Sequence, residues 1–125
     1  MNTPEQLRYT KDHEWLKVEG DEALIGITDY AQSELGDIIF AELPAVGIMI
    51  DKNDPFGTVE AVKAVSEVFM PVTGIVLAVN EEVTEKAEII NQDPYGAGWM
   101  LRVKLAKPEE VNDLMDATAY AAFIQ

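Results

Sequence analysis

Lys63 is the residue of this 125-residue chain with the clearest potential for chemistry. It is the only basic residue between positions 56 and 74, a stretch otherwise made mostly of apolar residues. A charged ammonium group is almost never buried without a partner, so within a half-buried strand pattern this side chain has to point outward. At the tip of a hairpin it would be fully reachable. From spacing alone, an ordinary exposed lysine remains the default interpretation, because short motif matches carry false positives.

Other kinds of active-site chemistry find little support in the sequence. The chain has no cysteine, which excludes a disulfide framework, a thiolate zinc site, an iron–sulfur cluster and a cysteine nucleophile. His13 is the sole histidine, and no second histidine or cysteine accompanies it, so we expect a structural residue with no metal ligation. No glycine-rich phosphate loop is present. We therefore expect a protein that is not an enzyme and that holds no metal.

The charge balance limits the classes of partner. Twenty-three acidic residues against nine basic ones give a formal net charge of −14. Binding to a phosphate backbone needs a basic patch, so we expect no nucleic acid and no anionic membrane as partners. Such a surface favours solubility and encounters with positively charged proteins or small molecules. No apolar signal segment or membrane-spanning stretch is visible, and we expect one cytosolic domain over residues 1–125.

The elements that must position Lys63 are mostly short strands. Apolar or alternating segments separated by turn residues span residues 14–18, 22–27, 38–43, 57–62, 67–70, 75–79 and 100–105. This spacing predicts an all-β sandwich or barrel. Thr28 is predicted to cap a short helix near residues 29–35 that ends at Gly36. Toward the C-terminus, one helix is predicted to begin at Pro108 and to include Leu114 and Met115, and a last one to begin at Asp116.

The remaining conspicuous side chains have ordinary structural interpretations. We expect the four aromatic residues Trp15, Phe69, Tyr95 and Trp99 to lie in the core or at an interface, and Met49, Met70 and Met100 to fill the core. The acidic pairs at 81–82 and 109–110 are expected to be solvated. A faint repeat at an offset of 27 residues relates Gly47 and Asn53 to Gly74 and Asn80, and would place Lys63 between its two copies.

A resemblance gives the lysine a more specific meaning. The segment Glu60-Ala61-Val62-Lys63, with a glycine at Gly74, resembles the lipoylation site of glycine cleavage system H proteins. The family has a serine where this chain has Ala61. In the family, the positions of Glu60 and Gly74 matter for recognition by the lipoylating enzymes. The resemblance continues through most of the chain, in the blocks at residues 9–15, 25–29, 35–37, 42–44, 88–91, 93–96, 98–99, 114–116 and 119–120.

The resemblance implies both a fold and a function. The fold would be a mostly β, lipoyl/biotinyl-type β-sandwich (barrel-sandwich hybrid), with a short helix near 29–35 and C-terminal helices. Lipoic acid would be attached to Lys63 as an amide by a lipoate ligase or an octanoyl/lipoyl transferase. The arm would carry the aminomethyl group from glycine decarboxylase (P-protein) to aminomethyltransferase (T-protein), and dihydrolipoyl dehydrogenase (L-protein) would reoxidise it. The setting would be bacterial cytoplasm, or the mitochondrial matrix for a processed eukaryotic form.

Family positions also suggest which acids hold the loaded arm. Its amine is expected to be protonated, and the resemblance makes Asp12, Glu14 and Glu67 the candidates for a carboxylate-lined cleft, with Asp12 replacing a serine of some members. These residues could equally be three solvated acids. Tyr30 and Glu34 are local departures, because many members carry histidine at the first position and some plant members at the second.

Two other carriers stay open as alternatives, namely a biotinyl carrier domain and an H-like relay protein. A biotinyl carrier domain shares the hairpin, although biotin sites resemble Ala-Met-Lys-Met and this chain has Ala61-Val62-Lys63-Ala64. Lipoyl domains of 2-oxoacid dehydrogenases usually show Asp-Lys-Ala within long multidomain chains. An H-like protein that mainly relays octanoyl or lipoyl groups to other carriers would have the same sequence features.

Overall fold

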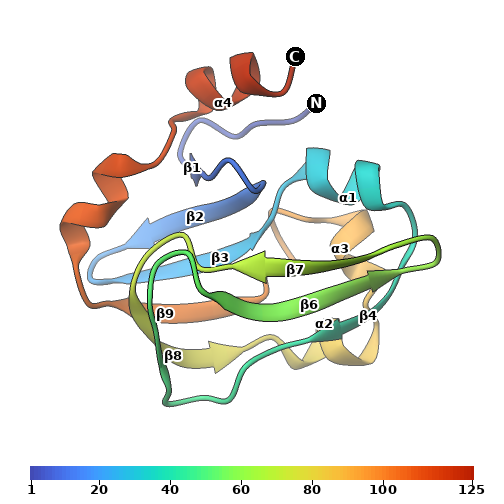
Figure 1. Ribbon diagram of the computed structural model, residues 1–125, viewed down its shortest axis with the longest axis horizontal. Coiled ribbons are helices and arrows are strands. Elements are labelled where there is room, and N and C mark those ends of the chain that lie inside the picture. The colour runs from blue at the N-terminus through green and yellow to red at the C-terminus, as the bar shows by residue number, and fades with distance from the viewer.

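The protein is built from two antiparallel sheets. The computed structural model describes all residues from 1 to 125. The six-stranded sheet has the order β1 (Arg8–Tyr9), β2 (Glu14–Glu19), β3 (Glu22–Ile27), β9 (Leu101–Leu105), β8 (Gly74–Val79) and β5 (Met49–Ile50). The smaller sheet has the order β4 (Ile38–Glu42), β6 (Pro55–Ala61) and β7 (Val65–Phe69), and its β6–β7 hairpin projects past the neighbouring strands (Figure 1). This mostly β architecture is the predicted one, and all seven expected strands are present.

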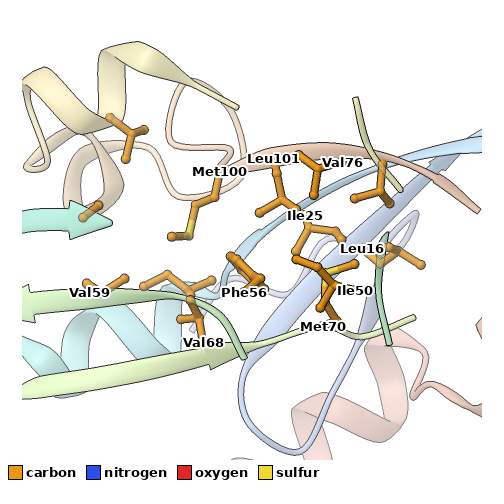
Figure 2. Close-up of a cluster of buried hydrophobic side chains, with 14 of the residues drawn as sticks. Leu16, Ile25, Ile50, Phe56, Val59, Val68, Met70, Val76, Met100 and Leu101 are labelled. Atoms are coloured by element: carbon orange, nitrogen blue, oxygen red, sulfur yellow. The ribbon is translucent and has the colours of Figure 1, made fainter. Parts of the chain in front are cut away.

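The main core lies between the two sheets. Side chains of Leu16, Ile25 and Leu101 from the larger sheet meet Phe56 and Val59 from the smaller one, and all are buried (Figure 2). Burial of each such side chain contributes about 1.5–3 kcal/mol, which makes this interface the main stabiliser of the fold.

Two of the three methionines that were predicted to fill the core are found there. Met70 and Met100 are buried within the core. Met49 was expected there too, and that expectation is wrong, because its side chain is 55% exposed. Met49 lies on the two-residue strand β5, where successive side chains face opposite ways, and its neighbour Ile50 takes the inward position.

A second, smaller core lies under the C-terminal helix α4 (Ala117–Phe123). Tyr9 and Tyr120 stack there with ring centroids 4.4 Å apart. Trp15 is also buried in this cluster, and its Nε1 donates a hydrogen bond to the carbonyl of Pro94 at 2.9 Å. Tyr95 and Trp99 pack against the cluster from outside, whereas Phe69 is only half-buried on β7. These aromatic residues join the two ends of the chain to β2.

The helix near the candidate lysine forms as its end signals predict. Helix α1 spans Asp29–Leu35, and the Thr28 hydroxyl accepts a hydrogen bond from the amide of Ala31. It ends at Gly36, whose φ of 79° is a conformation that favours glycine. Two further helices, α2 (Glu81–Glu85) and α3 (Ile89–Gln92), were not predicted, because four or five residues are too few to show a helical period.

The segment from Pro108 differs from the prediction. It forms a 3₁₀ helix, η1 (Pro108–Asp113), and the predicted continuation through Leu114 and Met115 is wrong. Leu114 is extended, and Met115 exchanges two main-chain hydrogen bonds with Tyr9, at 2.8 and 2.9 Å. This pairing with β1 competes with helix formation at those residues. Helix α4 then begins at Ala117, one residue after the predicted start at Asp116, and the Asp116 side chain caps it.

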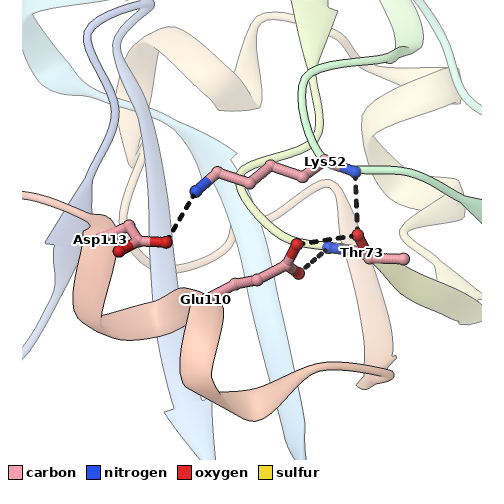
Figure 3. A network of polar contacts seen from close by, with 4 residues as sticks. All are labelled: Lys52, Thr73, Glu110 and Asp113. Carbon is pink, nitrogen blue, oxygen red and sulfur yellow. Dashed lines mark hydrogen bonds and ion pairs between the residues drawn. The ribbon is translucent and has the colours of Figure 1, made fainter.

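Glu110 is another correction, because it is not a solvated acid. Its carboxylate accepts hydrogen bonds from the Thr73 amide at 2.7 Å and from the Thr73 hydroxyl at 3.1 Å (Figure 3). The main-chain amide of Lys52 donates to the same hydroxyl, and the Lys52 ammonium pairs with Asp113 at 3.4 Å. These contacts fasten η1 to the turn before β8. Glu81, Glu82 and Glu109 are exposed as expected.

No helix of the protein has the length and apolar character needed to cross a bilayer.

Candidate functional site

Lys63 lies at the tip of the β6–β7 hairpin. The amide of Ala61 donates a hydrogen bond to the carbonyl of Ala64 at 2.7 Å, so only Val62 and Lys63 lie beyond the last rung. Both residues are exposed, and Lys63 takes part in none of the ion pairs of the protein. Its ammonium group is therefore reachable by another protein without prior unfolding.

The backbone of the tip is held in place from one side. The Val62 amide donates to the carbonyl of Asp37 at 3.0 Å, and Ile38 at the start of β4 pairs with Ala61. The connection between α1 and β4 thus runs beside the tip, as Figure 1 also shows. The lysine side chain makes no ion pair, whereas the main chain that carries it is held by hydrogen bonds.

Glu60 and Gly74 occupy different surroundings. Glu60 pairs with Val65 on β7 and lies half-exposed close to Lys63, on the outward face of the hairpin. Gly74 is buried in β8, which begins on the side of the molecule away from the tip (Figure 1). A Cβ at Gly74 would lie 2.8 Å from the main-chain oxygen of Lys104. Gly74 therefore has a packing reason to be glycine that is independent of any recognition by an enzyme.

A cleft of about 320 Å³ separates α1 from the edge strand β7, close to the lysine tip. It is lined by Asp12, His13, Tyr30, Ala31, Glu34, Leu35 and Ser66. Of the three predicted acids, only Asp12 is in this lining. Sequence analysis did not assign the helix residues Ala31, Glu34 and Leu35 to a cleft, although their spacing of three and four places them on one helix face.

Glu14 follows His13 of the cleft lining in the chain, and its side chain is 1% exposed. One carboxylate oxygen accepts a hydrogen bond from the Thr10 hydroxyl at 2.6 Å, and the other accepts one from the amide of Phe69 on β7 at 3.2 Å. Burial raises the pKa of this carboxyl to about 7, although both hydrogen bonds act to lower it. Near neutral pH, Glu14 is thus poised between its neutral and charged forms.

Glu67 lies on β7, two residues before Phe69, whose amide donates a hydrogen bond to Glu14. It pairs with Thr58 across the hairpin, and its side chain is exposed. Asp12 is close enough to Glu14 for its negative charge to raise the Glu14 pKa further. The structure therefore brings Asp12 and Glu14 together, and places Glu67 on the adjacent strand facing solvent.

His13 has the structural surroundings expected of it. Its Nδ1 lies 2.8 Å from the Tyr120 hydroxyl, which in turn lies 2.7 Å from the Thr28 hydroxyl. Its ring also lies against Tyr30, with centroids 4.7 Å apart. Burial lowers the pKa of His13, which favours the neutral ring. Its backbone φ of 70° is unusual for a residue with a side chain, and it turns the chain between β1 and β2.

Comparison with known proteins gives one consistent result. A family model described as "Glycine cleavage H-protein" matches residues 7–125. A glycine cleavage system H protein of Halothermothrix orenii is 53% identical over 125 residues, covering 100% of this chain and 98% of that protein. The one from Salinibacter ruber is 56% identical over 121 residues, covering 97% and 98%. The crystal structure of a glycine cleavage system H protein from Mycobacterium marinum superposes with a TM-score of 0.88 at 36% identity, covering 95% of this chain and 96% of that one.

Proposed function

Because the chain belongs to the glycine cleavage H-protein family, we propose that it is a lipoyl carrier whose arm is attached to Lys63. The observation that carries this proposal is the position of Lys63, exposed and free of ion pairs on a two-residue hairpin loop. A ligase must bring the ammonium group to an activated acyl group, and no ion pair of Lys63 has to be broken before it can do so. No other lysine of the chain occupies a hairpin tip between two strands of the smaller sheet.

The residues around the tip fit a lipoyl group. Amide formation removes the charge of Lys63, and no partner is left unpaired by that loss. The bound group would supply a disulfide that accepts the aminomethyl cargo. The cleft beside α1 offers the apolar side chains of Ala31 and Leu35 to an alkyl arm, together with the acids Asp12 and Glu34.

We propose that Asp12, Glu14 and Glu67 stabilise the protonated amine of the cargo. Asp12 lines the cleft, and Glu14 is buried close to Asp12 with its carboxylate hydrogen-bonded to Thr10 and to the amide of Phe69. A carboxylate near an ammonium group in a partly dehydrated site interacts more strongly than the same pair in water. Glu67, on the exposed side of β7, would act at the rim. Exclusion of water from this cleft would slow the hydrolysis of the cargo.

The partners follow from the carrier role. We propose that residues 1–125 act as one domain in bacterial cytoplasm, and that they meet the P-, T- and L-proteins in turn. A lipoate ligase or an octanoyl/lipoyl transferase would load Lys63, with Glu60 next to the lysine and Gly74 in the adjoining sheet as recognition residues. The flexible arm would raise the effective concentration of cargo at each active site while the protein stays bound. The net charge of −14 would steer encounters with basic surfaces.

Intact-mass analysis tests the attachment. The protein is incubated with a lipoate ligase, ATP and lipoate, and its peptides are then mapped. We expect one lipoyl-sized increment on the peptide that contains Lys63, absent from Lys63→Arg and retained in the control Lys86→Arg, which changes another exposed lysine. A biotin-sized increment after incubation with a biotin ligase, or an increment on another lysine, would contradict the proposal.

A second assay separates the shuttle from an octanoyl or lipoyl relay. Lipoylated protein is added to P-protein, and the exchange of labelled bicarbonate into the carboxyl group of glycine is followed. The shuttle role predicts exchange that saturates with the carrier and disappears with Lys63→Arg. Efficient transfer of the acyl group to a second carrier, without glycine exchange, would support the relay instead.

A further inference from the structure

The stem of Lys63 lies across a residue that has no side chain. A Cβ added to Gly36 would lie 3.3 Å from Cε of Lys63, 3.8 Å from its Nζ and 4.0 Å from its Cδ. All three outer atoms of the lysine are therefore within van der Waals reach of the space that a side chain at Gly36 would fill. The side chain of Lys63 therefore lies along the turn between α1 and β4 and does not point directly away from the protein.

Hydrogen bonds hold this turn in place, so that it can support the Lys63 side chain; we call the turn at Gly36 the seat. The side chain of Asn91, on α3, donates to the Gly36 carbonyl at 2.9 Å and accepts from the Ile38 amide at 2.9 Å. The Gly36 amide itself donates to the carbonyl of Gln32 at 3.0 Å. Together with the bond from Val62 to Asp37, these contacts fix the hairpin tip and the turn relative to each other.

The seat is next, along the chain, to residues that line the cleft between α1 and β7. Leu35, the residue before Gly36, lines that cleft from the helix side. Ser66, three residues after Lys63, lines it from the β7 side. A side chain that crosses from the tip over Gly36 therefore starts near a residue of each wall of the cleft, Leu35 on the helix side and Ser66 on the β7 side.

We propose that Gly36 is a positioning residue, which lets the Lys63 stem lie over the α1–β4 turn and so directs any group attached to Nζ toward the cleft. This inference rests on the proposed carrier function. Because Gly36 has no side chain, the Lys63 stem can lie over the turn. This position limits the directions in which the first part of the arm leaves the hairpin tip. A methyl group at this position displaces the stem and leaves the arm to sample directions away from the protein.

The backbone conformation of Gly36 gives a competing explanation, since its φ of 79° and ψ of −156° favour glycine by themselves. The chain provides matched controls. Gly20, with φ of 67°, and Gly47, with φ of 96°, also have positive φ, and a Cβ at either would have no atom within 4 Å. Gly20→Ala and Gly47→Ala therefore impose backbone strain without touching the lysine.

The first measurement uses the unmodified protein. Nuclear Overhauser effects are recorded between the ε-methylene of Lys63 and the α-methylene of Gly36, together with carbon relaxation at Cε of Lys63 and of Lys86, an exposed lysine without an ion pair. We expect the cross-peaks in the wild type and slower Cε motion for Lys63 than for Lys86. Gly36→Ala should bring Lys63 to the mobility of Lys86, whereas Gly47→Ala should leave it unchanged.

The second measurement uses the lipoylated and loaded protein. Displacing the stem should increase the rate of cargo release to water about two- to tenfold in Gly36→Ala, which corresponds to the cost of one off-rotamer side chain. Gly20→Ala and Gly47→Ala should match the wild type. Equal release rates in all four proteins would overturn the inference.

The outcomes separate this inference from the carrier proposal. If wild-type protein takes no lipoyl group, the carrier proposal fails, while the wild-type cross-peaks still decide whether the seat exists. If the arm is attached but Lys63 is as mobile as Lys86 in the wild type, the seat is refuted and the carrier stands. Should Gly36→Ala fail to fold, the wild-type comparison of Lys63 with Lys86 decides the question alone.

Discussion

Replacement of Glu14 by Gln should change how the stability of the protein depends on pH. Glu14 is 1% exposed, and burial raises its pKa from the ordinary value of 4.5 to about 7. A buried carboxyl with a raised pKa is tolerated by the folded state in its neutral form and penalised in its charged form. Glutamine resembles the neutral form, because it can accept from the Phe69 amide and donate toward Thr10.

The sign and size follow from proton linkage. Below pH 4.5 the carboxyl is protonated in both the folded and the unfolded state, so Glu14 carries no charge penalty. Between pH 4.5 and about 7 the unfolded chain has lost the proton while the folded protein keeps it, so the free energy of unfolding falls as the pH rises. The full penalty above this window is about 3 kcal/mol, from roughly 1.4 kcal/mol per pKa unit.

Urea unfolding of wild type and Glu14→Gln between pH 4 and pH 8 tests this reasoning. We expect similar stabilities near pH 4 and a growing advantage for the variant up to about 3 kcal/mol at pH 8, because the other acids cancel in the difference. Glu67→Gln is the matched control, since it replaces an exposed acid on β7 and should change the free energy of unfolding by less than about 0.5 kcal/mol. A constant difference for Glu14→Gln, or a wild type that is more stable at pH 8, would refute the raised pKa.

Three further substitutions test separate features. Lys63→Arg should abolish lipoylation in the mass assay yet change the free energy of unfolding by less than about 0.5 kcal/mol, because the side chain is exposed and makes no ion pair; a large loss would mean a structural role. Glu110→Gln should cost about 1–2 kcal/mol in urea unfolding, because one of the two Thr73 donors loses its charged acceptor, and exposed Glu109→Gln should be neutral. Gly74→Ala should cost about 1–3 kcal/mol, because its Cβ would press on the β9 backbone; lost lipoylation at unchanged stability would assign Gly74 to recognition alone.

Local chemistry was readable in the sequence. Thr28 and Gly36 marked both ends of α1 correctly, because a hydroxyl cap and a positive-φ glycine act on the residues next to them. The alternation on either side of Lys63 predicted two strands with the lysine near their junction, and the structure has β6 and β7 there.

Long-range pairing was not readable. Met115 leaves the predicted helix because Tyr9, more than a hundred positions earlier, offers both of its main-chain groups. Glu14 gave no sign of burial, because its partner Phe69 lies 55 residues away on an edge strand. The cleft could not be predicted either, because the sequence does not show that α1 lies opposite β7. In each case a side chain's surroundings depend on segments that the sequence does not pair by pattern alone.

The burial of Glu14 has a consequence for the choice of cargo. A neutral arm leaves the carboxyl poised near pH 7, so the protein bears the penalty of charging it without compensation. If the proposed cationic cargo came close to Glu14, its ammonium group would favour the charged form, lower the pKa of Glu14 and release a proton. Binding of a cationic cargo would thus recover up to about 3 kcal/mol of the penalty, which a neutral arm cannot recover. The same dehydration that weakens the unloaded protein would therefore make the cleft selective for the loaded arm over the unloaded one.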